Sequence, residues 1–499
     1  MSNIRRQSII SSAIIYFGFA LGFINTYLFT REGGFTESQY GLVGLFISIA
    51  NIMYSFAGLG MHAFIYKFYP YYSDNLTSKK NDIMSVATTI VIIGFLLVLT
   101  GGIIFKDLVI RKFSENSKDL ILYYEWLFPF GFGLTIYSIL EAYAWQQRES
   151  VITNTLKEVV FRLITTILIL LTFTGVIYSF DGFIKWFALT FLMIAFFLLG
   201  FLLYKKKINF SLSVSKVTKK FRKKILALSG FIWGGNIVYT AAQVFDSIII
   251  ASVIGLPGVA IFTLAQNISS LIQAPQRGII AAAIAPLSKA WKDKDYQKIN
   301  RIYQRSSINQ LIFALGMFLL IWLNFTDGVF TFNLKTHYLD ARYVFFFIGL
   351  WRVIDLGTGL NSQIIGTSVY WRFEFFTGII LIMVILPLNY FLTYSMGLIG
   401  PAISNLIGFF IYNFIRFLFL YKKFGMQPFS INTIYTILLG IGAFTIPYLL
   451  FQDRIGLIWI ILRSVTFCTV YIAGVFYLRL SPDILPVLGI LKNKVRGRR

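Results

Sequence analysis

Apolar segments of about 20 residues recur along the whole chain, and they constrain its fold more than any other feature of the sequence. Each segment is long enough to cross the roughly 30 Å hydrocarbon core of a bilayer as an α-helix. A water-soluble domain is about one quarter charged. Only 13% of this chain is charged, and its mean hydropathy is +0.73. We therefore expect an all-α polytopic membrane protein, which excludes the soluble enzymes.

The apolar windows predict about fourteen transmembrane helices. They lie near residues 9–29, 41–66, 83–105, 122–144, 158–178, 183–204, 225–255, 259–288, 306–326, 343–366, 374–394, 398–421, 433–451 and 456–480. The windows at 225–255 and 259–288 are longer than a straight crossing needs, so these helices are expected to tilt, bend or continue past the membrane surface. An even number of crossings puts both termini on the same side.

Lys and Arg are unequally divided between the two sides of this topology. Most of the 45 basic residues lie in one set of alternate connections, and they are densest in residues 205–224 and 289–305. Cytoplasmic loops of membrane proteins carry an excess of Lys and Arg, so this set and both termini are predicted to be cytoplasmic. The net charge of +24 is thus interpreted as a topology signal and not as a sign of a nucleic-acid partner.

The basic stretch also predicts the domain organisation. We expect an N-terminal six-helix bundle over residues 1–204, a cytoplasmic linker over 205–224, a C-terminal six-helix bundle over 225–421, and two extra transmembrane helices with a basic tail over 422–499. Both bundles open with two glycines four residues apart and a later asparagine: Gly18, Gly22 and Asn25, then Gly230, Gly234 and Asn236. This similarity favours two parallel repeats.

No catalytic motif is found in the sequence. The two histidines, His62 and His337, are far apart in the predicted topology, and the single cysteine, Cys468, lies within an apolar window. We therefore expect no metal site, no cofactor and no intrachain disulfide. Walker loops, zinc-protease motifs and nucleophile elbows do not occur. Membrane-embedded glycan polymerases generally need a large extracytoplasmic loop, but the outward connections reach only about fifteen residues. We predict that the protein is not an enzyme.

Charged side chains at membrane depth are the best candidates for function. Each costs about 2.5–3.5 kcal/mol on insertion scales, so it is tolerated mainly where it faces protein or water. Five arginines lie within predicted spans: Arg162, Arg277, Arg352, Arg416 and Arg463. Asp246 and Asp355 are the acidic residues well inside spans, so the interior is predicted to be cationic on balance. Arg162 and Arg416 are close enough to the cytoplasmic ends for their side chains to reach the surface.

Arg277 and Arg352 lie several residues from either end of their predicted helices. A guanidinium group matches the paired oxygens of a phosphate or a carboxylate, so we predict that both arginines contact an anionic substrate. In the alternative, Arg352 and Asp355, three residues apart on one helix, neutralise each other. Asp355 remains a second candidate for binding a coupling ion.

Asp246 is the stronger candidate for a coupling proton or cation, because no basic residue lies at helical spacing from it within its span. Asn236 and Gln243 are on the same segment, and Asn25 occupies the similar position in the first unit. We predict that these three amides are polar contacts of the substrate.

Short motifs in sequence order carry a resemblance to a known family. The first two spans contain an arginine, a Gly-containing turn, an aromatic-Gly pair and a Gly-Leu-Gly: Arg31, Gly34, Tyr40-Gly41 and Gly58-Leu59-Gly60. Asp246, Ala285-Pro286 and Gly397-Leu398-Ile399-Gly400-Pro401-Ala402 follow in later spans. The chain resembles the multidrug/oligosaccharidyl-lipid/polysaccharide (MOP) exporter superfamily, in particular the polysaccharide-biosynthesis branch of Wzx-type flippases. Pro401 stands where that family more often has a small residue.

The resemblance covers nearly the whole chain and implies two six-helix bundles around a central cavity, with two additional C-terminal helices. It implies transport of a polyprenyl-diphosphate-linked oligosaccharide from the cytoplasmic to the outer leaflet of the bacterial inner membrane, for O-antigen, capsule or exopolysaccharide synthesis. Membrane lipid and polysaccharide polymerase machinery would be its partners. We expect alternating access, with the diphosphate near Arg277 and Arg352.

Three alternatives remain open. A cation-coupled multidrug exporter of the same superfamily would present carboxylates to cationic substrates, which the excess of arginine argues against. A peptidoglycan-precursor flippase would share the diphosphate-lipid part of the substrate. A membrane scaffold without transport would explain the spans, but it would leave Arg277 and Arg352 without a reason.

Overall fold

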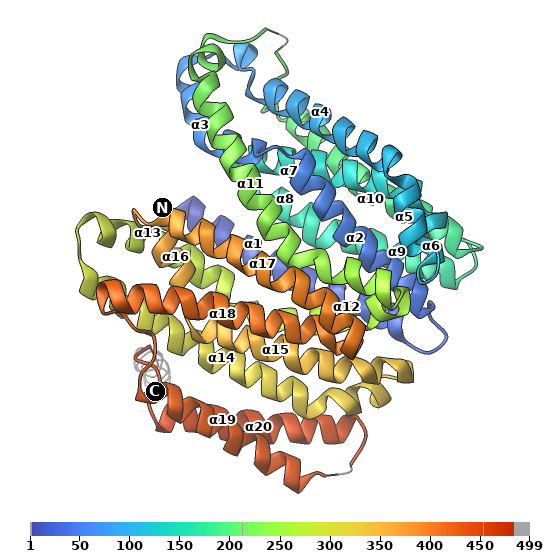
Figure 1. Cartoon of the computed structure of the whole chain (residues 1–499), viewed down its shortest axis with the longest axis vertical. Helices are drawn as coiled ribbons and strands as arrows, with labels where there is room; N and C mark the ends of the chain where they lie inside the picture. Colours follow the sequence, from blue (N-terminus) through green and yellow to red (C-terminus); the bar gives the residue numbers. More distant parts are fainter. Residues whose placement is uncertain (1, 212, 453, 484–499) are drawn as a thin grey trace, which may run out of the picture. The chain divides into compact units, whose positions relative to one another are not determined.

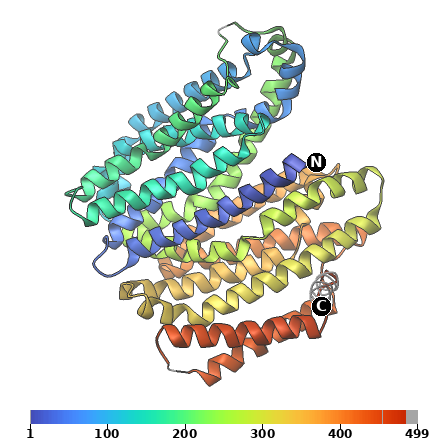
Figure 2. The same ribbon diagram turned by 180° about the vertical axis from the view of Figure 1, so that it is seen from behind.

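The computed structural model describes the backbone of residues 2–211, 213–452 and 454–483. Within these ranges it describes all side chains except those of residues 2–13, 15, 239, 243, 277, 278, 281, 282, 285 and 371. The regular elements of this part of the chain are all helices, shown in Figures 1 and 2. Contacts between helices divide the chain into two compact units, Met1–Ala260 and Ile261–Arg499.

The first unit contains α1 to α11. Their bounds are α1 (Ser2–Thr30), α2 (Glu37–Ala57), α3 (Met61–Asn75), η1 (Ser78–Lys80), α4 (Ile83–Ile104), α5 (Lys106–Phe113), α6 (Lys118–Leu122), η2 (Tyr124–Trp126), α7 (Leu127–Gln146), α8 (Ser150–Asn154), η3 (Thr155–Val160), α9 (Phe161–Phe173), α10 (Phe180–Tyr204) and α11 (Lys216–Val253). The division falls within α12 (Leu256–Ser269).

The second unit contains the remaining helices. Their bounds are η4 (Ser270–Gln273), α13 (Gln276–Lys292), α14 (Tyr296–Thr331), η5 (Thr336–Asp340), α15 (Ala341–Gly357), α16 (Asn361–Gly366), α17 (Trp371–Met396), α18 (Ile399–Phe424), α19 (Ile431–Leu450) and α20 (Leu457–Tyr477). The last two pack against each other and against α14.

The chain is an all-α polytopic membrane protein, as predicted. Ten helical segments in the described part are long and apolar enough to cross a membrane. The other four predicted windows fall on α1, on η3 with α9, on the segment from α12 to α13, and on α15 with α16. The window at 259–288 is broken by η4, and Pro275, which lacks an N–H group, occupies the N-cap of α13.

The window at 225–255 falls on a helix that is longer than a straight crossing needs. It belongs to α11, a single helix of 38 residues, which is about 57 Å long at 1.5 Å per residue. This helix packs along α2 and α3, so contacts place the division of the chain at residue 260 instead of at the basic stretch 205–224. The four-part division drawn from the sequence stays a prediction.

Two glycine motifs let α2 approach its neighbours closely. A Cβ atom on Gly41 would lie 1.9 Å from the carbonyl oxygen of Leu256. After α2 ends, Leu59 and Gly60 take left-handed φ values of 44° and 71°, and a Cβ on Gly60 would lie 2.2 Å from the carbonyl oxygen of Ser229 in α11. Only glycine fits at both close approaches, because any larger residue would overlap backbone atoms.

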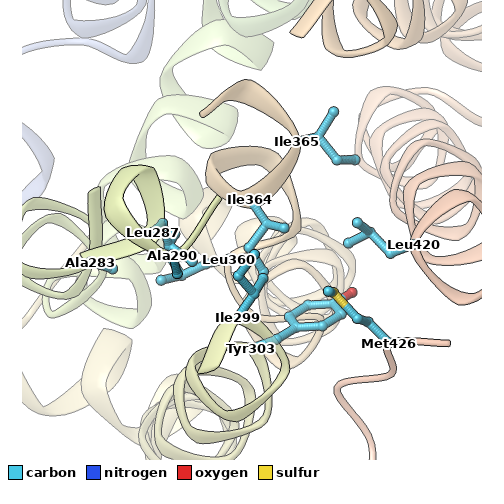
Figure 3. Packing of buried hydrophobic residues seen from close by; sticks show 10 residues of the cluster. All are labelled: Ala283, Leu287, Ala290, Ile299, Tyr303, Leu360, Ile364, Ile365, Leu420 and Met426. Carbon is cyan, nitrogen blue, oxygen red and sulfur yellow. The ribbon is translucent and has the colours of Figure 1, made fainter. Parts of the chain in front are cut away.

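The core of the second unit includes a cluster that joins α13, α14, α16 and α18. Figure 3 shows its buried members: Ala283, Leu287, Ala290, Ile299, Tyr303, Leu360, Ile364, Ile365, Leu420 and Met426. Ile299 and Tyr303 come from the first turns of α14 and are fully buried. The cluster therefore fixes the start of α14 against the short helix α16 and the end of α18.

Candidate functional site

Three of the five intramembrane arginines form ion pairs with carboxylates of their own unit. Arg162 pairs with Glu158 one helical turn earlier, with an N–O distance of 3.0 Å. The other two pairs join different helices: Arg416 with Glu374, and Arg463 with Asp327. The positive charge of these three arginines is thus neutralised by the fold.

Glu374 and Asp327, the ion-pair partners of Arg416 and Arg463, are not among the residues predicted from the sequence. They lie at or just beyond the ends of the predicted apolar windows, so they were not counted as intramembrane carboxylates. Arg416 was expected to reach the membrane surface, but it is only 2% exposed. Its guanidinium contacts the Glu374 carboxylate and the Tyr412 hydroxyl instead. The spacing of Glu158 and Arg162, in contrast, is a signal that sequence alone could have identified.

Arg352 on α15 has a different environment, because its hydrogen-bond partners are neutral. Its Nη1 donates to the carbonyl oxygen of Ser269 at 3.1 Å and to Oε1 of Gln273 at 2.8 Å. Its Nε is buried and makes no hydrogen bond. Among the residues that the structure describes, no carboxylate lies within ion-pairing distance of Arg352. Asp355, one turn away, attracts this guanidinium through space but does not contact it as an ion pair. Arg352 therefore has no direct carboxylate partner among the described residues and keeps a donor that is not used.

Asp355 takes part in a separate polar network. Its Oδ1 accepts a hydrogen bond from Nδ2 of Asn413 at 2.9 Å, and Gln276 also hydrogen-bonds to the carboxylate. Asn413 in turn accepts from Nδ2 of Asn361 at 2.8 Å and from Thr358 at 3.2 Å. The alternative in which Arg352 and Asp355 neutralise each other as an ion pair is therefore not what the structure contains, although the two residues are one turn apart.

Arg277 is the second residue of α13, and its side chain lies outside the described residues. Its backbone follows Gln273, the contact of Arg352, by four residues. The break between η4 and α13 therefore brings the two predicted arginine positions to one region of the second unit. The backbone N–H groups at the start of α13 lie in the same region and carry partial positive charge.

The remaining predicted site residues belong to the first unit. Nδ2 of Asn25 donates to the carbonyl oxygen of Arg162 at 2.9 Å, and Oδ1 accepts from Thr166 at 2.6 Å. Asn25 therefore links α1 to α9 through two hydrogen bonds. Asn236 lies 3.2 Å from Nε2 of His62. The Gln243 side chain lies outside the described residues. Asp246 on α11 is 2% exposed.

Residues 4–291 match the model of a protein family described as polysaccharide biosynthesis protein. The chain belongs to the polysaccharide biosynthesis protein family. A comparison with curated protein sequences finds no significant match. The resemblance drawn from the sequence motifs, to the polysaccharide-biosynthesis branch of the MOP superfamily, is thus confirmed.

Solved structures of a flippase and of transporters share the fold of this polysaccharide biosynthesis protein. The lipid II flippase MurJ, in an inward closed conformation, has a TM-score of 0.70 and 17% sequence identity, over 95% of this chain and 99% of that chain. An inward-facing multidrug resistance MATE family transporter has a TM-score of 0.66 and 16% identity, over 83% and 94%. A MOP superfamily transporter from Pyrococcus furiosus has a TM-score of 0.56 and 16% identity, over 84% and 95%.

Proposed function

We propose that this protein flips a polyprenyl-diphosphate-linked oligosaccharide from the cytoplasmic to the outer leaflet of the bacterial inner membrane by alternating access. The flipped lipid serves the synthesis of a surface polysaccharide such as O-antigen, capsule or exopolysaccharide, and both termini are cytoplasmic. The family match and the MOP transporter fold support this proposal at the level of transport. The environment of Arg352 is the observation that carries the substrate assignment.

Arg352 offers a diphosphate a positive charge and a free N–H donor. A buried cation is costly unless it is neutralised. Arg162, Arg416 and Arg463 have carboxylate partners, whereas the partners of Arg352 are a carbonyl and an amide oxygen. An anionic ligand would supply the missing countercharge. The unused Nε allows an additional charge-assisted hydrogen bond to a phosphate oxygen. The start of α13, with Arg277, adds a second positive group in the same unit.

The membrane potential supports the outward direction. A bacterial membrane is negative inside, so outward movement of negative charge is favourable by roughly 2.3 kcal/mol per charge per 100 mV. A diphosphate diester carries about two negative charges, and its export is therefore assisted by the potential itself. A coupling cation at Asp246 or Asp355 is compatible with this mechanism but not required by it.

The ion pairs of the intramembrane charges also bear on the three alternative functions. A multidrug exporter for cationic substrates would present carboxylates to them, but Glu158, Glu374 and Asp327 are each paired with arginine, which removes these three from such a role. A peptidoglycan-precursor flippase is compatible with Arg352, and the family match favours the polysaccharide substrate over it. A scaffold without transport has no use for a partly buried guanidinium that has no direct carboxylate partner.

The test replaces Arg352 by Lys and by Gln in a strain that depends on the protein for surface polysaccharide. Lys keeps the charge and loses the guanidinium fork, whereas Gln loses both. We expect export to fall in the order Arg, Lys, Gln. Loss of one charge-assisted contact, about 1.5–3 kcal/mol, weakens substrate binding by about 10- to 100-fold. Arg342→Gln, near the start of the same helix, is the matched control and should export normally.

Two outcomes would contradict this role of Arg352. Full export by Arg352→Gln would remove the residue from the substrate site. Recovery of export in the double variant Arg352→Gln with Asp355→Asn would mean that the single substitution acts through an unbalanced Asp355 and not through the substrate.

A further inference from the structure

A second group of basic residues lies on α14, apart from the candidate substrate site. Lys298, Arg301 and Arg305 are spaced by three and four residues, so they share one face of the helix. All three are exposed. Arg305 pairs with Asp483 at 3.6 Å, and Asp295 caps the helix by accepting a hydrogen bond from the Lys298 backbone N–H at 3.0 Å. The face keeps an excess of positive charge.

Two cavities open on this basic face. The first, of about 350 Å³, is lined by all three basic residues together with Ile302, Gln297 and the helix-capping Asp295, so basic residues outnumber carboxylates in it by three to one. The second, of about 470 Å³, shares Arg301 and Arg305 with the first. Its wall also contains Ile308 of α14, Ser430 and Asn432 at the start of α19, and Leu480 after the end of α20. The combined surface thus places guanidinium groups beside hydroxyl, amide and apolar groups.

The other face of this part of α14 is fixed in the core. Ile299 and Tyr303 are fully buried and pack against Leu360 and Met426, as Figure 3 shows. The basic residues therefore stand on a helix whose orientation is held by packing, and not on a loose terminal turn.

The length of α14 puts the basic face at the level of the lipid headgroups. The helix has 36 residues, which corresponds to about 54 Å, well above the roughly 30 Å of hydrocarbon. Its first turns, up to Arg305, are polar and basic, and the apolar sequence follows from Ile308 onward. This end of the helix is the one that the distribution of Lys and Arg assigns to the cytoplasm.

We propose that the face formed by Lys298, Arg301 and Arg305 binds the headgroup of an anionic phospholipid from the cytoplasmic leaflet. The basic side chains bind the phosphates, and Ile302, Ile308 and Leu480 contact the glycerol and upper acyl carbons. A soluble phosphate compound would use the charges but would have no partner for the apolar wall. Because the two cavities share Arg301 and Arg305, a headgroup with two phosphates, as in cardiolipin, matches them best.

Native mass spectrometry of the full-length protein in detergent, with cardiolipin or phosphatidylcholine added, tests the site. The variant K298Q/R301Q/R305Q removes the three charges. The matched control K216Q/K219Q/K223Q removes three exposed charges with the same spacing at the start of α11. We expect cardiolipin binding to weaken by about 100-fold in the first variant, since each of the three basic residues near a membrane surface contributes about five-fold. The control should change it less than two-fold.

The single variant Arg301→Gln keeps the test valid if the triple variant misfolds. Arg301 is exposed and lines both cavities, so its replacement should weaken cardiolipin binding by about five-fold at unchanged thermal stability. Equal losses in the two triple variants, or equal affinity of the unaltered protein for cardiolipin and phosphatidylcholine, would overturn the proposal. Competition by inorganic pyrophosphate as strong as that by cardiolipin would exclude the lipid as the preferred ligand. This test is independent of the transported substrate.

Discussion

At the residue scale, the functional value of an intramembrane arginine depends on what neutralises it. Arg416 and Arg463 have carboxylate partners from other helices, whereas Arg352 contacts neutral oxygens. A buried ion pair is costly to break, because the remaining charge loses its only compensation. We therefore interpret the paired arginines as residues that stabilise the fold, and Arg352 as a residue that binds the ligand.

The Arg416–Glu374 pair gives a direct prediction on stability. Arg416→Met should destabilise the protein by about 2–4 kcal/mol, because the partly buried Glu374 carboxylate, held also by Ser362 at 2.6 Å, loses its cation. The double variant Arg416→Met with Glu374→Leu should recover most of this loss. Thermal unfolding in detergent measures both. A double variant as unstable as the single one would mean that Arg416 acts mainly through other contacts, such as that with Tyr412.

Asp246 provides the residue-scale prediction on coupling. It is 2% exposed on α11, within the predicted span 225–255. If it binds a coupling cation, Asp246→Asn should abolish the proton or sodium dependence of transport in reconstituted vesicles while the protein remains inserted and abundant, since Asn has nearly the same shape. An ion dependence identical to that of the unaltered protein would assign Asp246 a structural role.

At the element scale, close helix approach explains two of the family motifs. Gly41 near the start of α2 lies against backbone atoms of Leu256, and Gly60 at the N-cap of α3 lies against those of Ser229. Similar spacing does not guarantee a similar role. A Cβ on Gly18 would meet the Glu158 carbonyl oxygen at 2.5 Å, whereas Gly230, its counterpart in the proposed repeat, has open space around it.

Gly41→Ala tests the importance of this approach. The added methyl group would overlap the Leu256 carbonyl, so α2 must shift, and we expect a loss of about 1–3 kcal/mol in stability. Gly101→Ala in α4 is the control, because nothing lies within 4 Å of its Cβ position. The control should be neutral or stabilising by up to about 1 kcal/mol. Melting temperatures in detergent that are equal for the two variants would show that α2 adapts without cost.

At the scale of the whole molecule, the orientation in the membrane is the main testable property. The stretch 205–224 is predicted to be cytoplasmic, because its basic residues oppose translocation. The connection around Ser114 is predicted to be outside. With Cys468 replaced, Ser114→Cys should react in intact cells with an impermeant thiol reagent, and Ser211→Cys only after lysis. Labelling of Ser211→Cys from outside would invert the topology.

The polytopic all-α class, the family and the approximate positions of the ten long apolar helices follow from the sequence alone. These depend on local properties: the length of an apolar run, the basic residues beside it, and glycines at fixed positions. The tertiary structure decided which charges meet. Arg416 and Glu374 are 42 residues apart, and adjacency on one helix did not make Arg352 and Asp355 a pair. Such partners depend on how helices pack, and packing brings together side chains whose spacing in the chain carries no signal.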